Sequence, residues 1–260
     1  MKEKLLNVPL YVIMVIFLVP IIILFYLSGL SGIVTAFSDS GFIYSLILTF
    51  LAAIAATIIN IILGTPVAYS LARKLVRWES SAYDLLLSPI SIPHTVVGIM
   101  LLITFSPVSP IYFFTRFMNP VNTFFGMVLA MFFVSAPIYI MAMKEYFQRL
   151  DPVHELFTMS LGNDRLKTFM KVVFPMSSGS IMRVSMISLG RALSEFGSLI
   201  ILTYTVSMAP LFSFVSPSTV FIWYKYETYG LLPALRYSSA MLLISMILTL
   251  VLYLVSKRAD

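Results

Sequence analysis

Long apolar runs separated by short polar stretches dominate the 260-residue chain. A run of about 20 apolar residues is long enough to cross the hydrocarbon core of a bilayer as a helix. Backbone groups in lipid must be hydrogen-bonded internally, so helices are the expected form. The pattern predicts an all-α polytopic membrane protein, with one transmembrane domain over 1–260. Its six transmembrane helices are expected at about 8–30, 42–71, 83–105, 121–143, 178–205 and 232–255.

Two of these runs contain residues that disturb a regular helix. The run 42–71 is longer than the hydrocarbon core is thick and holds Asn60 and Gly64-Thr65-Pro66. Proline lacks the amide hydrogen and clashes with the preceding turn, so a kink is expected there. The run 83–105 includes Pro93 and is expected to be a broken or bent span.

Charge patterning indicates the orientation. Charged residues make up 11% of the chain and hydrophobic residues 60%, whereas soluble domains carry about 25% charged residues. The net charge is +6, but the basic residues flank the apolar runs as orientation signals do, and no nucleic-acid partner is expected. The larger set, expected inside, is Lys2, Lys4, Arg73, Lys74, Arg77, Lys144, Arg149, Arg165, Lys167, Lys171, Lys257 and Arg258; the outer set is Arg116, Lys225 and Arg236.

This asymmetry predicts cytoplasmic N- and C-termini in a plasma or inner membrane, with lipid as a partner. The first run follows Lys2 and Lys4 as a signal peptide would. It is longer than the usual apolar region of a signal, and no cleavage site follows, so an uncleaved span is expected.

Residue types exclude several chemistries. The chain has no cysteine and two histidines, and no metal site is predicted. His154-Glu155 begins like a zinc-protease H-E-x-x-H, but Thr158 occupies the second histidine position. A phosphate-binding G-x-x-x-x-G-K-[ST] loop is absent, since no Gly-Lys pair occurs. No catalytic residue and no bound cofactor are therefore expected on this chain.

The longest polar stretch, 144–175, predicts two short helices. Asp151 is a good N-cap, Pro152 suits the first helical position and Gly162 suits the stop, so one helix is expected over 152–162. Its apolar residues are Leu156, Phe157, Met159 and Leu161. A helix this short is not stable alone in water, so a groove in this chain or a partner, or the membrane surface, must cover it.

The second helix of this stretch is expected to open at Asn163 and Asp164 and to run to about Val173. Pro175 is expected to stop it before the fifth span.

The same stretch resembles a known family. Permeases of ABC importers carry E-A-A-x-x-x-G, nine residues and then I-x-L-P. Here nine residues separate Gly162 from Val172-Val173-Phe174-Pro175. Leu156-Phe157-Thr158 stands where E-A-A is usual, and Glu155 lies one residue early. The fold class that the resemblance implies is that of a type I ABC-importer permease.

Four other segments resemble the molybdate/tungstate branch of that family. They are GTPVAYSLAR at 64–73, IPHTVVGI at 92–99, FVSAPIYI at 133–140 and RALSEFG at 191–197. Sulfate/thiosulfate permeases share several of them. The resemblance therefore implies import of a tetrahedral oxyanion, molybdate or tungstate first and sulfate or thiosulfate as the alternative.

The resemblance also implies partners. They are a second copy of the chain, a cytoplasmic ABC ATPase dimer that carries ATP-Mg, and an extracytoplasmic oxyanion-binding protein. The segment 152–162 would be the coupling helix that docks on the ATPase. The ATPase-coupling residues would be Asp151, Pro152, Glu155, Leu156, Phe157, Met159, Leu161, Gly162 and Pro175.

Ionisable residues at membrane depth are costly and normally face a protein interior or an aqueous cavity. Arg191 and Glu195 are four residues apart and are expected on one helix face. They could form an ion pair that fixes packing, or a gate in an anion pathway. Further candidates for the pathway or gate are His94, Thr95, Ser194 and Gly197.

Each of these candidates also has a structural explanation, since a lone histidine is more often hydrogen-bonded structure. The small residues Gly190, Ser194 and Gly197 would let another helix approach closely, from a second copy or another span.

Two function classes compete with the importer. An ion-driven secondary carrier would transport without an ATPase and would need more buried carboxylates than Glu195 supplies. An intramembrane enzyme would need a catalytic dyad or a metal cluster at membrane depth, which two histidines and no cysteine do not favour.

Overall fold

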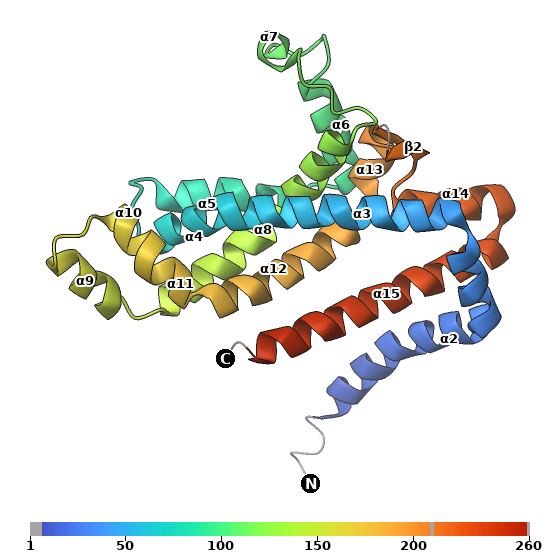
Figure 1. The fold of residues 1–260 in the computed structure, drawn as a ribbon, viewed down its shortest axis with the longest axis horizontal. Helices are drawn as coiled ribbons and strands as arrows, with labels where there is room; N and C mark the ends of the chain where they lie inside the picture. The colour runs from blue at the N-terminus through green and yellow to red at the C-terminus, as the bar shows by residue number, and fades with distance from the viewer. Residues whose placement is uncertain (1–6, 209–210, 259–260) are drawn as a thin grey trace.

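The computed structural model describes residues 7–208 and 211–258, which are mainly helical. The long helices run mostly along the longest axis of the molecule, although the first of them is oblique and bends at Gly29 (Figure 1). They are α2 (Val8–Ser38), α3 (Ser40–Ile59), α8 (Phe124–Arg149), α12 (Ser178–Leu193) and α15 (Leu231–Arg258).

Among the described residues, four segments are long and apolar enough to cross a membrane singly. They are Val8–Ser38, Ser40–Ala72, Phe124–Arg149 and Leu231–Val251. Two bent pairs meet the same test together: Glu79–Ser91 with His94–Thr104 at 111°, and Arg165–Met176 with Ser178–Leu193 at 75°. Counting each pair as one span gives up to six, the number predicted, although the second pair begins within the polar stretch 144–175 and ends before the expected residue 205.

The third span breaks where its prolines stand. Helix α5 (Glu79–Leu87) and the 3₁₀ turn η2 (Ser88–Ser91) form its first half. Pro93 then has an extended backbone with ψ 134° and is the N-cap of α6 (His94–Thr104). The predicted break is confirmed.

The second span is interrupted by a π turn. This turn, η1 (Asn60–Gly64), joins α3 to α4 (Thr65–Ala72). It ends two residues before Pro66, whose missing amide hydrogen removes one bond of a regular helix. The wider turn accommodates that loss, so the expected kink takes the form of a π turn.

The fifth span differs from the prediction of one helix over 178–205. Helix α12 ends at Leu193, and a short helix, α13 (Gly197–Leu202), follows a break. The prediction of a continuous helix is wrong because the Glu195 side chain accepts a hydrogen bond from the backbone N–H of Ser198, at 2.9 Å, in the first turn of α13. A carboxylate that binds a backbone amide in this way starts a new helix.

The polar stretch forms α9 (Val153–Ser160), α10 (Arg165–Thr168), the π turn η3 (Phe169–Val173) and α11 (Phe174–Met176). Gly162 has φ 88° and is the predicted stop, and Asp164 caps α10 by accepting from the Lys167 amide at 2.7 Å. That bond to the backbone lowers the pKa of Asp164.

Two details of this stretch were predicted wrongly. Pro152 is the N-cap of α9 rather than its first residue, and the Asp151 carboxylate accepts from the Val153 amide at 3.0 Å. Pro175 does not stop the second helix, which continues to Met176. The π turn η3 precedes this proline, so the helix passes it with a locally altered bonding pattern.

The segment after α13 contains two short strands and a helix. It forms an antiparallel hairpin of β1 (Val206–Met208) and β2 (Phe212–Val215), with Val206 opposite Val215, and then α14 (Ser218–Tyr229). The all-α prediction missed these strands, which are too short to show an alternating pattern. A short helix, α7 (Tyr112–Thr115), lies beyond α6.

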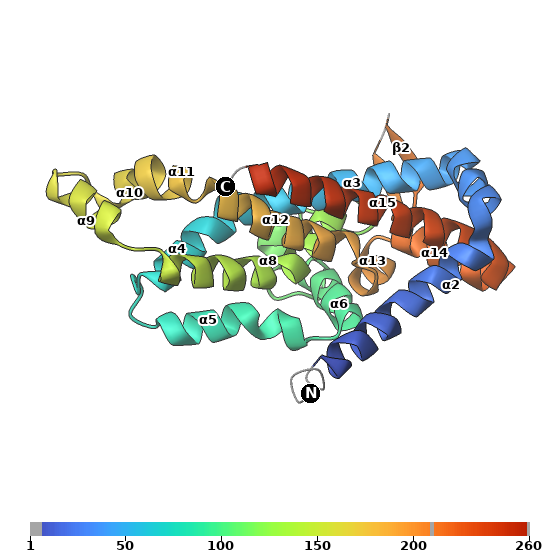
Figure 2. The ribbon, with the colours of Figure 1, turned by 90° about the horizontal axis from the view of Figure 1, so that it is seen from below.

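The molecule has two distinct ends. Helix α9, α10 and the connection from α4 to α5 lie at one end, here called the α9 end (Figures 1 and 2). The turns from α2 to α3 and from α14 to α15 lie at the opposite end. Lys2 and Lys4, which belong to the predicted inner set, lie outside the described residues.

A polar cluster stabilises the end opposite α9. Asp39 caps α3 by accepting from the Gly41 amide at 2.9 Å. Its other oxygen accepts from the Tyr237 hydroxyl at 2.7 Å and lies 3.4 Å from Lys225 Nζ. Partial burial alone would raise the pKa of Asp39, but the Tyr237 hydroxyl and the Lys225 charge outweigh it and hold that pKa below its ordinary value.

Candidate functional site

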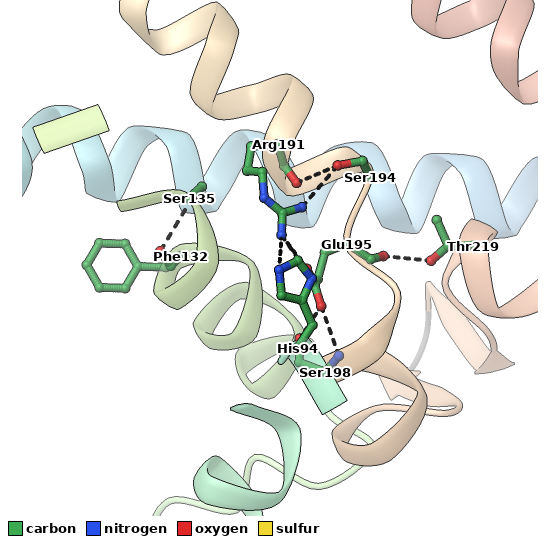
Figure 3. A network of polar contacts seen from close by, with 8 residues as sticks. All are labelled: His94, Phe132, Ser135, Arg191, Ser194, Glu195, Ser198 and Thr219. Atoms are coloured by element: carbon green, nitrogen blue, oxygen red, sulfur yellow. Dashed lines mark hydrogen bonds and ion pairs between the residues drawn. The ribbon is translucent and has the colours of Figure 1, made fainter. Parts of the chain in front are cut away.

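A polar network lies where α12, α13 and α6 meet (Figure 3). At its centre is Glu195, which is 0% exposed. One carboxylate oxygen accepts from the Ser198 amide and hydroxyl at 2.9 and 2.8 Å. The other lies 3.2 Å from Arg191 Nη2 and 3.0 Å from His94 Nδ1. The predicted pair of Arg191 and Glu195 is therefore present, with histidine and serine partners added.

His94 bridges the two charges. Arg191 Nη2 lies 2.6 Å from His94 Nε2, and His94 Nδ1 faces Glu195. Arg191 Nη2 also lies 2.9 Å from His94 Nδ1, so the imidazole ring lies between the guanidinium and the carboxylate. The negative charge of Glu195 thus compensates Arg191, which leaves the arginine a weak attractor for an anion in this conformation.

Close packing holds the network in place. A Cβ on Gly197 would lie 2.7 Å from the Cβ of His94, so only glycine allows α13 to approach α6 this closely. Gly98 is similarly close to Ile201 on the other side of the same contact. Gly197 therefore packs against another span of the same chain, one of the two partners predicted for it.

Thr95, another residue predicted for the pathway or gate, follows His94 and is exposed.

A groove with a volume of about 1010 Å³ opens beside this network. Helices α12, α14 and α15 line it. Ser194, which accepts from Arg191 at 3.1 Å, and Thr219, which donates to the Glu195 carbonyl at 2.8 Å, border it. Gly190 also lines it, and a Cβ added at this glycine would meet no other atom within 4 Å. Most of the other lining residues are apolar, but Arg183, Ser238, Ser245 and Thr249 also line the groove and offer polar groups to a solute.

The short helix α9 presents an exposed apolar face. Within the described chain, Phe157 is 65% exposed, and Val153, Leu156 and Leu161 are similarly uncovered. Met159 is half-buried. Because α9 stands at one end of the molecule (Figure 1), this face is accessible to another protein.

Glu155 differs from the other residues predicted to couple to an ATPase. It is 4% exposed and turned into its own chain. Its carboxylate accepts from the Tyr69 hydroxyl at 2.8 Å and from Arg73 Nη2 at 2.6 Å. Glu155 therefore fastens α9 to the end of α4 and does not contribute to the exposed face.

The side chains that bind Glu155, and the bonds that Asn60 makes, were not identified from the sequence. Arg73 was interpreted as an orientation signal, and Tyr69 as part of an apolar run; their spacing of four residues on one helix was the available signal. Asn60 was seen as an interruption. It is buried, and its amide donates to Ser135 and Ser188, each at 2.8 Å, so it links η1 to α8 and α12.

The fold is that of an ABC-transporter permease. It superimposes on a chain of a bacterial ABC transporter involved in the import of the acidic polysaccharide alginate with a TM-score of 0.67 at 15% identity, covering 99% of this chain and 95% of that one. A second structure of an alginate transporter, in complex with an alginate-bound periplasmic protein, gives 0.65 at 16% identity. At 15–16% sequence identity, this structural similarity establishes the fold alone.

Sequence comparison defines the family. The molybdate/tungstate transport system permease protein WtpB of Thermococcus kodakarensis is 35% identical over 188 residues, which are 72% of each chain. The protein of that name from Methanocaldococcus jannaschii is 27% identical over 90% of this chain and 89% of its own. The sulfate transport system permease protein CysT of Synechocystis is 26% identical over 80% and 72%. No protein-family profile matches the chain.

The chain belongs to the molybdate/tungstate permease family of ABC transporters. Members are non-catalytic transport subunits, and ATP is hydrolysed on a separate ATPase.

Proposed function

We propose that this permease imports a tetrahedral oxyanion, with molybdate or tungstate as the cargo. The family relationship carries the proposal, since the relatives with 34–35% identity bear that name. Sulfate or thiosulfate is the second candidate, supported by the relationship to CysT. One competition experiment distinguishes the two candidate cargoes. Reconstituted transporter should take up radiolabelled molybdate, and unlabelled tungstate should compete for uptake while sulfate does not.

The groove along α12 supports a path that holds its cargo weakly. Its lining is mainly apolar, with the Arg183 side chain and several hydroxyls, those of Ser194 and Thr219 among them, as polar groups, and the adjoining Arg191 is compensated by Glu195. Such a surface attracts an anion without binding it tightly, which suits a conduit supplied by a separate binding protein. ATP binding on the motor would open the path outward, and the binding protein would then release the anion into it.

A second copy of the chain would close this groove. Ile187 lines the groove and is exposed in the single chain. Because the chain has no cysteine, Ile187→Cys provides a clean test. Mild oxidation in membranes should give a disulfide-linked dimer, whereas Phe113→Cys on α7, also exposed, should not. Monomer alone from both variants would contradict this arrangement.

The exposed face of α9 would dock in a cleft of the ATPase dimer. Phe157→Asp places a charge at the centre of this apolar face and should abolish co-purification with the ATPase. The matched control is Phe113→Asp, a phenylalanine of similar exposure on α7, far from α9 (Figure 1). Retained association of the Phe157 variant would refute docking through α9.

The α9 end would face the cytoplasm, with both termini on that side. The basic residues of the inner set between Arg73 and Lys171 belong to the α4–α5 connection, the end of α8, and α10 to η3, all at that end. A membrane-impermeant maleimide should label Thr228→Cys, in α14, in intact cells and should not label Ser160→Cys. Both positions are exposed, so the reverse pattern would overturn the orientation.

A further inference from the structure

Glu155 forms a buried junction between α9 and the transmembrane bundle. Its carboxylate binds three donor groups: the Tyr69 hydroxyl at 2.8 Å, Arg73 Nε at 3.1 Å and Arg73 Nη2 at 2.6 Å. The Glu155 and Arg73 side chains are 6% and 14% exposed. Charge-assisted, two-pronged bonds of this kind are directional and roughly twice as strong as neutral ones.

Arg73 binds the start of the same connection as well. Its Nη2 donates to the carbonyl of Leu150, the C-cap of α8, at 3.0 Å. One guanidinium therefore holds both the residue that ends α8 and the glutamate inside α9. Since Arg73 directly follows α4, three helices converge on it.

The aromatic surroundings keep this junction rigid. The Tyr69 ring packs against Phe147 of α8 and Phe169 of η3, with ring centroids 5.6 and 4.8 Å apart. Apart from the Glu155 bonds, the backbone of α9 packs on α10 and η3, its neighbours along the chain. The side chain of Glu155 thus gives α9 a direct connection to the second span.

The second span can carry a displacement further. Thr65, at the start of α4, shares a 2.7 Å hydrogen bond with Tyr139 of α8. In η1, Asn60 donates to Ser188 of α12 at 2.8 Å. Ser188 lies three residues before Arg191, so the contacts lead from α9 to the helix that carries the candidate gate.

We infer that Glu155, Arg73 and Tyr69 form a latch through which a displacement of α9 is passed to α4. The inference rests on the proposed docking of α9 on an ATPase. Glu155 is then a positioning residue that acts through Arg73 and touches neither cargo nor ATPase. Its loss should uncouple the motor from transport while leaving the docking face intact.

The test uses the complete transporter, with its ATPase and binding protein, in liposomes. Uptake of radiolabelled molybdate and hydrolysis of ATP are measured on the same samples. In Glu155→Gln and in Tyr69→Phe, the ATPase should co-purify as in the wild type. Hydrolysis should continue, but molybdate taken up per ATP should fall about fivefold or more, the usual lower range of coupling between sites.

Glu145→Gln is the matched control. It neutralises an exposed glutamate near the same end of α8 that pairs with Arg149 on the surface. Its ratio of uptake to hydrolysis should equal that of the wild type. A merely structural role of Glu155 would lower the amount of assembled transporter but leave this ratio unchanged.

The outcomes separate two claims. A wild-type ratio in every assembled variant overturns the latch and leaves the proposed function standing. Absence of ATPase association or of molybdate uptake in the wild type overturns the proposed function itself. If Glu155→Gln does not assemble, Tyr69→Phe decides, because it removes one hydroxyl and keeps the ring packing.

Discussion

Replacing Glu195 by glutamine isolates the charge of the buried network. The glutamine side chain has the same length, and its oxygen can still accept from the amide and hydroxyl of Ser198, now at 2.9 and 2.8 Å. What is lost is the negative charge that faces Arg191 at 3.2 Å and His94 at 3.0 Å. The variant therefore leaves a buried arginine without its counter-charge.

The magnitude follows from burial. Removing one partner of a fully buried pair costs about 3–5 kcal/mol. The Arg191 side chain is 20% exposed and can reach water in part, so we expect roughly 2–3 kcal/mol. For a chain of this size, that corresponds to a fall of roughly 4–12 °C in the unfolding midpoint.

Thermal unfolding of the purified protein in detergent measures this change. Trp223 is a local reporter, because its ring centroid lies 6.3 Å from that of Phe196, the residue after Glu195. The control is Ser194→Ala, which removes an exposed hydroxyl that accepts from Arg191. Its midpoint should stay within about 2 °C of the wild type, since exposed polar contacts contribute little.

An unchanged midpoint for Glu195→Gln, within about 1 °C, would refute this reasoning. The same variant also distinguishes the two roles left open by the sequence. A structural pair predicts lower stability with normal uptake per assembled transporter. A gate predicts that anion leaks across liposomes without ATP.

Three further predictions concern backbone and charge. Gly197→Ala should lower the free energy of unfolding by about 1–3 kcal/mol, because the added methyl group would lie 2.7 Å from the Cβ of His94 in α6. The control Gly190→Ala should not lower it, since the added methyl group has open space around it. Asp39→Asn should be less stable than the wild type at neutral pH. Because folding lowers the Asp39 pKa, its contribution is present above the ordinary value of 3.8 and is lost as the pH falls through the folded value, so the two midpoints should converge in acid. Gly162→Ala should cost about 1–2 kcal/mol through its φ of 88°, seen as faster amide exchange around the α9–α10 connection.

Each prediction has a clear contrary result. Equal unfolding midpoints for the two alanine variants at Gly190 and Gly197 would contradict the packing argument. A constant difference between Asp39→Asn and the wild type down to strong acid would show that the aspartate charge is not involved. Unchanged exchange in Gly162→Ala would show that the backbone relaxes without strain.

Hydrophobic patterning predicted a helical membrane protein with up to six spans, because the bilayer dictates the length and apolar character of such helices. It also located the break before His94, since proline removes a specific hydrogen bond. The break after Leu193 was not predicted. It depends on the Glu195 carboxylate, which binds the Ser198 amide and starts a new helix. Hydropathy does not distinguish this arrangement from a continuous helix, because both consist of the same apolar residues.

Pairings between distant spans were the least accessible from sequence. The contact of Arg191 with Glu195 follows from spacing within one helix, but that of Glu195 with His94 depends on how α6 and α13 pack. In the same way, Glu155 was counted among the ATPase-coupling residues because motif spacing describes position along the chain. The neighbouring residues, here Arg73 and Tyr69, decide which side of a short helix is buried.

The π turn at Asn60–Gly64 determines the direction in which the later side chains of the second span point. A helix advances about 100° per residue, so deleting one residue from this turn would rotate Tyr69 and Arg73 by about that angle. Both side chains would then point away from Glu155, although every helix could remain intact. The single widened turn thus acts as a spacer that keeps a distant ion pair in register.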